Sequence, residues 1–279
     1  MPEVRLDQAT ISYRVLGPEE SPHPPVLFVH GILVDHRLWV KVAEVLAGKG
    51  FRCFLPDLPL GSHKIPVDDD VLRSPSAAAE LVHEFVVALD LQDVTLVGND
   101  TGGGLCQLLI DAHPERIGRL VLTNCDAFDK FPPFPFNVVF ATMRGPQSIK
   151  ALAGLMRIPA LRSSPLGFGL LLERDDELTG SWIEPCIADR RIAQNLATLL
   201  RGVAATDLTD VATRLPRFDK PVTVVWGQAD RSFTPALGRR LAALFPNVKL
   251  IEVPNARTFV ALDAPAAVVD AITTVGATP

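Results

Sequence analysis

The order of apolar and helical segments constrains the fold of this chain most. Apolar runs at residues 26–31, 51–59, 94–98 and 119–124 are typical of buried parallel strands. Segments with helical spacing stand between these runs, at 36–48, 74–90 and 101–113. Because strand, helix and strand in this order form parallel crossover units, the pattern predicts an α/β protein with helices on both faces of a parallel sheet.

The alternation breaks after residue 127 and returns at 221–227. Residues 128–215 contain no clear strand and open with the Pro/Phe-rich segment FDKFPPFPF before helical, apolar stretches. The remaining expected strands lie at 4–6, 10–16 and 248–253, and the remaining helices at 235–245 and 265–273. We therefore expect a mostly parallel eight-stranded core domain, residues 1–127 and 216–279, and an inserted helical cap, residues 128–215.

Composition and charge narrow the class of partner. The chain has 279 residues, of which 48% are hydrophobic and 21% charged, with a net charge of -5. No basic cluster exceeds a pair such as Arg190-Arg191, so no nucleic-acid partner is expected. The start, MPEVRLDQAT, lacks the features of a signal peptide, and no apolar run reaches the ~18 residues of a membrane span.

The four cysteines form no CxxC pair, which favours reduced thiols in a cytoplasmic protein over disulfides or a metal site. The expected partner is a small-molecule substrate, with no cofactor, no metal and no membrane. The protein is expected to be a monomer or a homodimer.

The segment VGNDTGGG, residues 97–104, joins an expected strand to an expected helix. Gly98 and Gly102 stand two residues on either side of Asp100, as in the sharp G-x-nucleophile-x-G turn. A simple helix cap is the alternative interpretation of Asp100, whereas a phosphate loop is excluded because neither GxGxxG nor GK[ST] is present. At a helix N-terminus the carboxylate is expected to be ionised, with a low pKa.

Three further motifs follow expected strands. They are HG at 30–31, DLP at 57–59 and WGQAD at 226–230. With the glycine-flanked turn they resemble the α/β-hydrolase superfamily from about residue 4 to residue 273. An aspartate in the turn resembles the haloalkane dehalogenase and epoxide hydrolase branch of that superfamily.

The resemblance implies roles for individual residues. It implies that the cap covers the active site, that Asp100 is the nucleophile and that Asp230 is its remote acid partner. The backbone N–H groups of Ile32 and Thr101 would form the oxyanion hole.

An aspartate nucleophile favours a particular chemistry. Aspartate is charged at neutral pH, so it can attack a saturated carbon directly and leave an ester on the enzyme. Its attack on a carbonyl would give a reactive anhydride. We therefore expect dehalogenase-like hydrolysis at sp3 carbon of a small, mainly apolar substrate.

The chain departs from the family at the expected base. The family's histidine would stand at Thr258, and a threonine is no general base; all six histidines lie before residue 114. Three of them lie on or near loops where the site should be, and these are candidate substitutes: His30, His36 and His63. Two alternatives stay open, namely a lyase, isomerase or cyclase that uses Asp100 as acid/base, and a ligand-binding pseudoenzyme.

The chain lacks several residues that the two activities of this branch usually require. Epoxide hydrolases of this fold protonate the epoxide oxygen with cap tyrosines, and the sole tyrosine here is Tyr13, in an N-terminal strand. At the positions where the dehalogenases hold halide, this chain has Thr101 and Ile32. The residues expected to line the substrate pocket are His30, Asn124, Phe136, Thr258 and Phe259.

Overall fold

The computed structural model describes residues 1–68, 70–173 and 177–276. Its sheet has eight strands in the order β1-β2-β4-β3-β5-β6-β7-β8. The pairs β1–β2 and β2–β4 are antiparallel and the other pairs are parallel, which confirms the expected fold class. The strands are β1 (Glu3–Arg5), β2 (Thr10–Leu16), β3 (Val26–Val29), β4 (Cys53–Pro56), β5 (Val94–Asp100), β6 (Ile117–Cys125), β7 (Val222–Gly227) and β8 (Val248–Val253).

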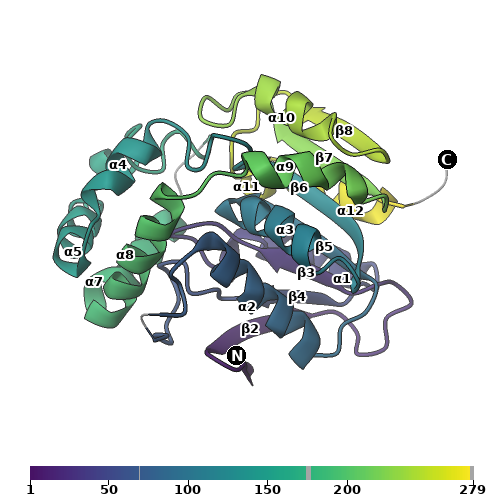
Figure 1. Cartoon of the computed structure of the whole chain (residues 1–279), viewed down its shortest axis with the longest axis horizontal. Coiled ribbons are helices and arrows are strands. Elements are labelled where there is room, and N and C mark those ends of the chain that lie inside the picture. Colours follow the sequence, from purple (N-terminus) through teal and green to yellow (C-terminus); the bar gives the residue numbers. More distant parts are fainter. Residues whose placement is uncertain (69, 174–176, 277–279) are drawn as a thin grey trace.

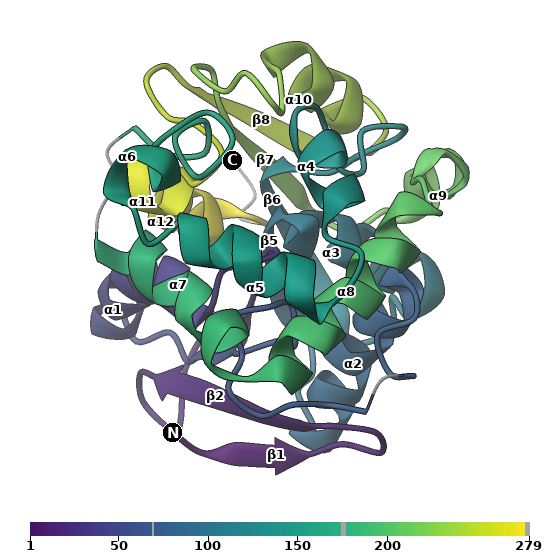
Figure 2. The ribbon, with the colours of Figure 1, turned by 90° about the vertical axis from the view of Figure 1, so that its left-hand side faces the viewer.

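Helices cover the sheet on both faces (Figures 1 and 2). On one face α2 packs against α3, and on the other α1 packs against α12. The core helices are α1 (Val40–Gly48), α2 (Pro75–Ala88), α3 (Thr101–Ala112), α10 (Pro235–Ala242), α11 (Val260–Asp263) and α12 (Pro265–Thr274). The central strands β3 and β4 are buried along their whole length, as their continuous apolar sequences predict.

Local capping explains where several helices begin. The Ser74 side chain accepts a hydrogen bond from the Ala77 N–H and Pro75 is the first helical residue, as the Ser-Pro-Ser sequence predicts. The helix expected at 36–48 is interrupted: a 3-10 turn, η1 (His36–Leu38), precedes α1. The Asp35 side chain caps this turn at the Arg37 N–H, so a separate short element forms there.

A helical insertion stands between β6 and β7. It contains α4 (Phe136–Thr142), α5 (Pro146–Leu155), α6 (Pro159–Arg162), α7 (Glu177–Ala188) and α8 (Arg190–Ala204), and it is followed by α9 (Thr209–Arg214) and the 3-10 turn η2 (Leu215–Arg217). Figure 1 shows α4, α5, α7 and α8 beside one edge of the core, and we call residues 128–215 the cap.

The order of the strands fixes where a site can form. From β3 the chain continues to β4 on one side, and from β5 it continues to β6 on the other side. The neighbouring strands β3 and β5 are therefore the place where the strand order changes direction. In such sheets, ligands bind beyond the carboxyl ends of the strands at this switch point. The residues that follow β3 and β5 are therefore the first place to look for chemistry.

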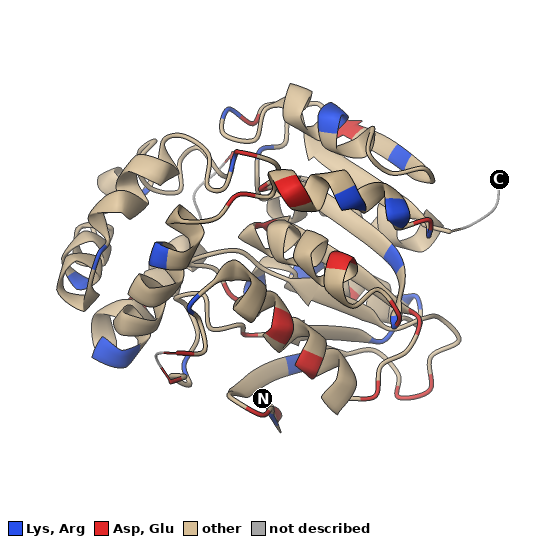
Figure 3. Cartoon of the chain, viewed as in Figure 1, with Lys and Arg blue, Asp and Glu red and all other residues tan. Residues whose placement is uncertain are grey.

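The distribution of charge is mixed. In Figure 3 acidic and basic residues are interspersed over the core helices, and no continuous basic band crosses the face in view. Within the described ranges, no helix combines the length and the apolar character that crossing a membrane requires.

Candidate functional site

Asp100 lies in a strained turn at the end of β5. Its backbone angles are φ 53° and ψ -132°, a region that residues other than glycine rarely adopt. The turn brings neighbouring atoms so close to the two flanking glycines that a side chain would not fit at either position. A Cβ on Gly98 would lie 2.7 Å from Cys106 Sγ, and one on Gly102 would lie 2.3 Å from the Val29 carbonyl oxygen. The sharp turn expected from the sequence is present, and strain of this kind clusters at functional sites.

Two backbone N–H groups hold the carboxyl group of Asp100. They belong to Thr101, the first residue of α3, and to Ile32, in the loop after β3. Gly31 allows the loop to come this close, because a Cβ there would lie 2.1 Å from Asp100 Oδ2. The two expected oxyanion donors thus converge on the expected nucleophile.

The pKa of Asp100 is raised to about 7, contrary to the low pKa expected at a helix N-terminus. Burial of the carboxylate is the largest cause and the charge of Asp230 adds to it. The N–H groups of Thr101 and Ile32 oppose both effects but do not outweigh them. At neutral pH, Asp100 is therefore poised between its ionised and neutral forms.

Asp230 and Thr258 form the pair that the resemblance placed at the acid and base positions. Thr258 is fully buried, and its hydroxyl donates a 2.7 Å hydrogen bond to Asp230 Oδ2. The N–H groups of Ser232 and Phe233 donate to Asp230 Oδ1 at 2.8 and 2.9 Å. Burial nevertheless raises the pKa of Asp230 to about 6. At the position that the resemblance assigned to the base, this chain thus has a hydroxyl that donates to Asp230.

Asn124 supports this pair from the end of β6. Its Nδ2 donates to Asp230 Oδ2 at 2.8 Å, and its Oδ1 accepts from the Gly227 N–H at 2.6 Å. Asn124 was expected to be a polar group in the pocket. The structure instead bonds its side chain to Asp230, outside the pocket lining.

His30 and His36 are engaged in the core beside the site. His30 is fully buried, with Nδ1 2.9 Å from the Gly31 carbonyl oxygen and Nε2 accepting from the Leu58 N–H at 2.9 Å. Burial lowers the pKa of His30. His36 Nδ1 lies 2.6 Å from Asp57 Oδ1. Because both ring nitrogens of His30 have partners, neither is free to accept a proton from water over Asp100.

His63 faces a different cleft. Its Nε2 lies 3.3 Å from Asn195 Oδ1, and its Nδ1 accepts from the Gly61 N–H at 3.2 Å. Burial lowers its pKa to about 4, which makes it a weak base at neutral pH. The cleft that it lines, with Asp35 and Arg37, does not include Asp100.

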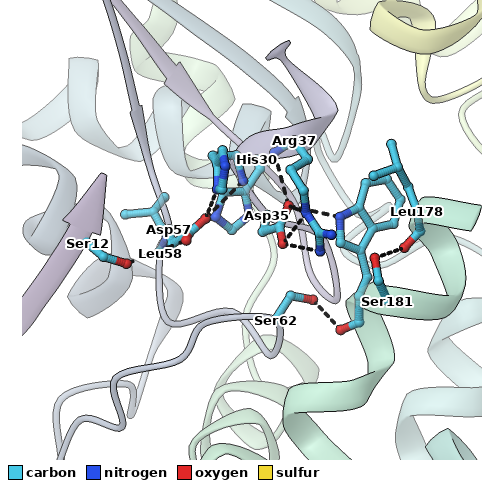
Figure 4. A network of polar contacts seen from close by, with 11 residues as sticks. Ser12, His30, Asp35, Arg37, Asp57, Leu58, Ser62, Leu178 and Ser181 are labelled. Atoms are coloured by element: carbon cyan, nitrogen blue, oxygen red, sulfur yellow. Dashed lines mark hydrogen bonds and ion pairs between the residues drawn. The ribbon is translucent and has the colours of Figure 1, made fainter. Parts of the chain in front are cut away.

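Figure 4 shows how the loop after β3 is tied to the cap. Asp35 accepts hydrogen bonds from the Arg37 side chain at 2.6 to 2.9 Å and from Trp182 Nε1, on α7, at 2.9 Å. The Ser62 hydroxyl donates to the Trp182 carbonyl oxygen at 2.7 Å. These bonds fix α7 over the loop that carries the Ile32 N–H.

An apolar pocket opens over Asp100, between the core loops and the cap. The space inside it that the centre of a water-sized sphere can occupy is about 70 Å³. The side chains lining it are apolar apart from those of Asp100 and Thr101, within the ranges that the structure describes. Of the residues expected to line the pocket, Phe136 does so. The other apolar side chains of the lining are Ile32, Leu33, Pro132, Pro133, Val139, Phe140, Met143, Leu152, Ala153, Met156, Leu166, Phe168, Leu171 and Ile183. His30, Asn124, Thr258 and Phe259 are not part of this lining.

Sequence reasoning missed Asp126. This residue follows β6 directly and is fully buried. Within the described ranges its carboxyl oxygens make no well-formed hydrogen bond, although the nearby Thr101 side chain lowers its pKa slightly against the effect of burial. The Asp126 N–H donates to the Asp100 carbonyl oxygen at 3.3 Å, so Asp126 adjoins the expected nucleophile. The signal was available, because an aspartate immediately after a buried strand lies at the carboxyl edge of the sheet.

Two clusters have spacing suited to a metal ion, among the residues described. One is Glu80, His83 and His113 on the outer helices, and the other is Asp35, His36 and Asp57. Asp35 in the second cluster is already bound by Arg37 and Trp182. Neither cluster includes Asp100 or Asp230.

Comparisons with known proteins show the family of the chain. The family described as alpha/beta hydrolase fold matches residues 24–265. A haloalkane dehalogenase of Mycobacterium tuberculosis is 28% identical over 276 residues, covering 91% of this chain and 88% of that protein. A 2-hydroxy-6-oxononadienedioate/2-hydroxy-6-oxononatrienedioate hydrolase of Cupriavidus pinatubonensis is 27% identical over 234 residues, covering 81% of this chain and 77% of that protein.

Solved structures show the same fold at lower identity. A putative ancestral haloalkane dehalogenase superposes with a TM-score of 0.77 at 19% identity, covering all of both chains. An esterase from Thermogutta terrifontis superposes with a TM-score of 0.72 at 21% identity, covering 98% of this chain and 97% of that one.

Proposed function

Because this chain belongs to the α/β-hydrolase family, we propose that it is a hydrolase whose nucleophile is the carboxylate of Asp100. Its substrate is a small, mainly apolar molecule, attacked at a saturated carbon. The observation that carries the proposal is the position of Asp100, in a strained turn facing a pocket that is otherwise almost wholly apolar.

The apolar pocket supports attack at sp3 carbon. An alkyl chain gains about 25 cal/mol for each Å² of apolar surface that it buries, so this pocket favours such substrates over charged ones. Asp100 would displace the leaving group and become an ester. The N–H groups of Ile32 and Thr101 would then stabilise the oxyanion that forms when water attacks this ester.

The similarity to a haloalkane dehalogenase, over most of both chains, also supports this chemistry. The proposal departs from the usual mechanism at the base, since the Thr258 hydroxyl donates to Asp230 and offers no basic nitrogen. Release of the ester must therefore use another proton acceptor.

Alkylation of the protein tests the proposal. After incubation with 1-bromohexane, we expect intact-mass spectrometry to show one added hexyl group and peptide mapping to locate it on Asp100. The variant Asp100→Asn should show no adduct. The variant Asp111→Asn, in which the changed carboxyl normally pairs with Arg214, should react like the parent protein. A broad panel of haloalkanes that gives neither an adduct nor released halide would refute the proposal.

The raised pKa of Asp100 favours a second candidate, a non-hydrolytic enzyme that uses Asp100 as an acid/base. A carboxyl group with a pKa of about 7 can both accept and donate a proton at neutral pH. The same panel separates the two, because an acid/base forms no covalent adduct. A ligand-binding protein without activity would bind members of the panel and leave them unchanged.

A further inference from the structure

Glu80, His83 and His113 lie together on the outer surface of the helix pair α2 and α3, and none of them lines the pocket over Asp100. One ligand atom from each side chain lies within 4.8 Å of the other two. Zinc binds carboxylate oxygens and imidazole nitrogens at about 2.0–2.2 Å, so two ligands of one tetrahedral ion lie about 3.4 Å apart. The three atoms are therefore already close to the spacing that a single zinc ion requires.

The two helices bring these side chains together. Glu80 and His83 are three residues apart in α2, which places them on the same side of that helix. α2 lies beside α3 (Figure 1). His113 ends α3, where its N–H donates to the Leu109 carbonyl oxygen at 2.7 Å and Pro114 follows. Two of the ligands thus come from one helix, and the third comes from the fixed end of its neighbour.

The contacts within the cluster leave ligand atoms to offer. Glu80 Oε2 lies 3.0 Å from His113 Nε2, and the rings of His83 and His113 stack with centroids 3.8 Å apart. Among the described residues, the ring nitrogens of His83 have no hydrogen-bond partner. Stacked rings direct their lone pairs side by side, so one ring must turn about χ2, a broad torsion in histidine, to face a shared ion. The His113 side chain is 34% exposed, which leaves it room to turn.

The charges around the cluster suit a cation. Glu80, Glu115 and Arg116 are the charged groups that act on His83. Arg116 is paired with Asp90, its Nη1 2.8 Å from Asp90 Oδ1. The carboxylates of Glu80 and Glu115 therefore outweigh the guanidinium, and an incoming metal ion meets a negative surface.

The second cluster of metal-binding residues differs in this respect. Asp35 accepts hydrogen bonds from Arg37 and Trp182, and Asp57 Oδ1 lies 2.6 Å from His36 Nδ1. Its carboxylates are thus engaged within the protein. The cluster on α2 and α3 has the freer ligand atoms and is open to solvent, from which an ion arrives.

We infer that Glu80, His83 and His113 form a zinc site that joins α2 to the end of α3, with water as the fourth ligand. Two imidazoles and one carboxylate are a ligand set that zinc accepts. Glu80 and His113 are 33 residues apart in the chain, so no short motif reveals the site. The ion would stabilise the folded protein, because the unfolded chain does not hold the three ligands together. This inference is independent of the proposed function of Asp100.

Zinc binding tests the site directly. Tag-free protein is treated with EDTA, desalted and titrated with zinc chloride in a calorimeter. We expect one zinc ion per chain. Glu80→Gln, His83→Gln and His113→Gln should each weaken binding by more than about 100-fold, since loss of a group that only supports a metal ligand already costs about 10–100-fold.

Two control variants separate ligation from general effects. His23→Gln removes a half-buried imidazole that stacks on Phe51, away from the site. Glu115→Gln removes a charge beside the site but no proposed ligand. Both variants should keep the affinity within about fivefold, since one exposed charge pair contributes at most about 1 kcal/mol. Full affinity in either His83→Gln or His113→Gln, or an equal loss in His23→Gln, would overturn the site.

X-ray absorption of the zinc-bound parent protein gives a measurement that does not depend on the folding of a variant. We expect nitrogen and oxygen ligands at about 2.0–2.2 Å, with the outer scattering of two imidazole rings. A sulfur ligand at about 2.3 Å would place the ion at a cysteine and refute the inference, as would a titration without stoichiometric binding. The urea midpoint should rise with zinc in the parent protein and stay constant in His83→Gln.

Discussion

Asp100 lowers the stability of the folded protein at neutral pH. Its pKa is 3.8 in an unfolded chain and about 7 in the folded state, so the folded state binds the proton more tightly. The contribution of Asp100 to the free energy of unfolding is therefore fully present below pH 3.8 and is lost as the pH rises through about 7. Active-site groups often carry such a penalty.

Asp100→Asn should remove the penalty. At one pKa unit per 1.36 kcal/mol, we expect the variant to gain about 1–4 kcal/mol in the free energy of unfolding at pH 8 and progressively less toward pH 4. Urea unfolding at the two pH values measures this difference. Asp111→Asn should instead lose about 0.5–1 kcal/mol at pH 8, because it breaks a partly exposed ion pair with Arg214. A gain for Asp100→Asn that does not change with pH would contradict the explanation.

Motif positions alone identified much of the site. The glycine spacing predicted the turn at Asp100. The resemblance assigned Asp230 to the acid position and Thr258 to the position of the histidine, and the structure joins these two residues by a hydrogen bond. The direction of the Asp100 pKa shift could not be predicted, because it depends on how completely the cap and neighbouring strands exclude water. The position of Asp126 directly after a buried strand could be read from the sequence, whereas the surroundings of its carboxyl group depend on how distant side chains pack.

At the scale of elements, the indole of Trp182 is one of the links between α7 and the core. Trp182 Nε1 donates to the charged Asp35 at 2.9 Å, and the ring packs against Phe168 and Phe259 with centroids 5.8 Å away from each. Trp39 is an internal comparison, since it is fully buried as well but its Nε1 has no hydrogen-bond partner among the residues that the structure describes. The two indoles therefore differ in hydrogen bonding and resemble each other in burial.

Trp182→Phe should destabilise the protein by about 1.5–3 kcal/mol more than Trp39→Phe does, the value of a hydrogen bond to a charged group. Both variants leave a cavity of similar kind, so the comparison isolates the N–H. Urea unfolding measures the difference, and hydrogen exchange should show faster opening of α7 than of α2. Equal losses in the two variants would mean that the indole bond does not hold the cap.

The strands of the sheet and the longer core helices followed from local sequence, whereas the short turn η1 did not. The apolar runs predicted the strands because burial on both faces of a parallel sheet demands them. The 3-10 turn at His36–Leu38 depends on distant contacts as well as on Asp35, since the His36 N–H donates to Asp57 Oδ1, 21 residues away, at 3.0 Å. Contacts of this kind are not encoded in the spacing of neighbouring residues.

At the scale of the whole molecule, the cap and the sheet share one hydrophobic core. Trp182, Ile183 and Leu196 from the cap belong to the same buried cluster as the residues of β3 and β5. The two parts should therefore unfold together. We expect near-UV and far-UV circular dichroism to report one coincident thermal transition, with equal calorimetric and van't Hoff enthalpies. Loss of the near-UV signal at a lower temperature would show that the cap melts first.

The two N–H groups around Asp100 have a consequence for which bonds the protein can cleave. In the resting protein they are occupied by the carboxyl group of Asp100, the nucleophile that we propose. An incoming carbonyl compound finds its activating donors already taken, whereas a saturated carbon requires no donor in order to be attacked. Under the proposed mechanism, these donors act only once the ester exists, at the step that uses them. The proposal therefore implies that occupancy of the two backbone N–H groups selects the class of bond, before the shape of the cap discriminates between substrates.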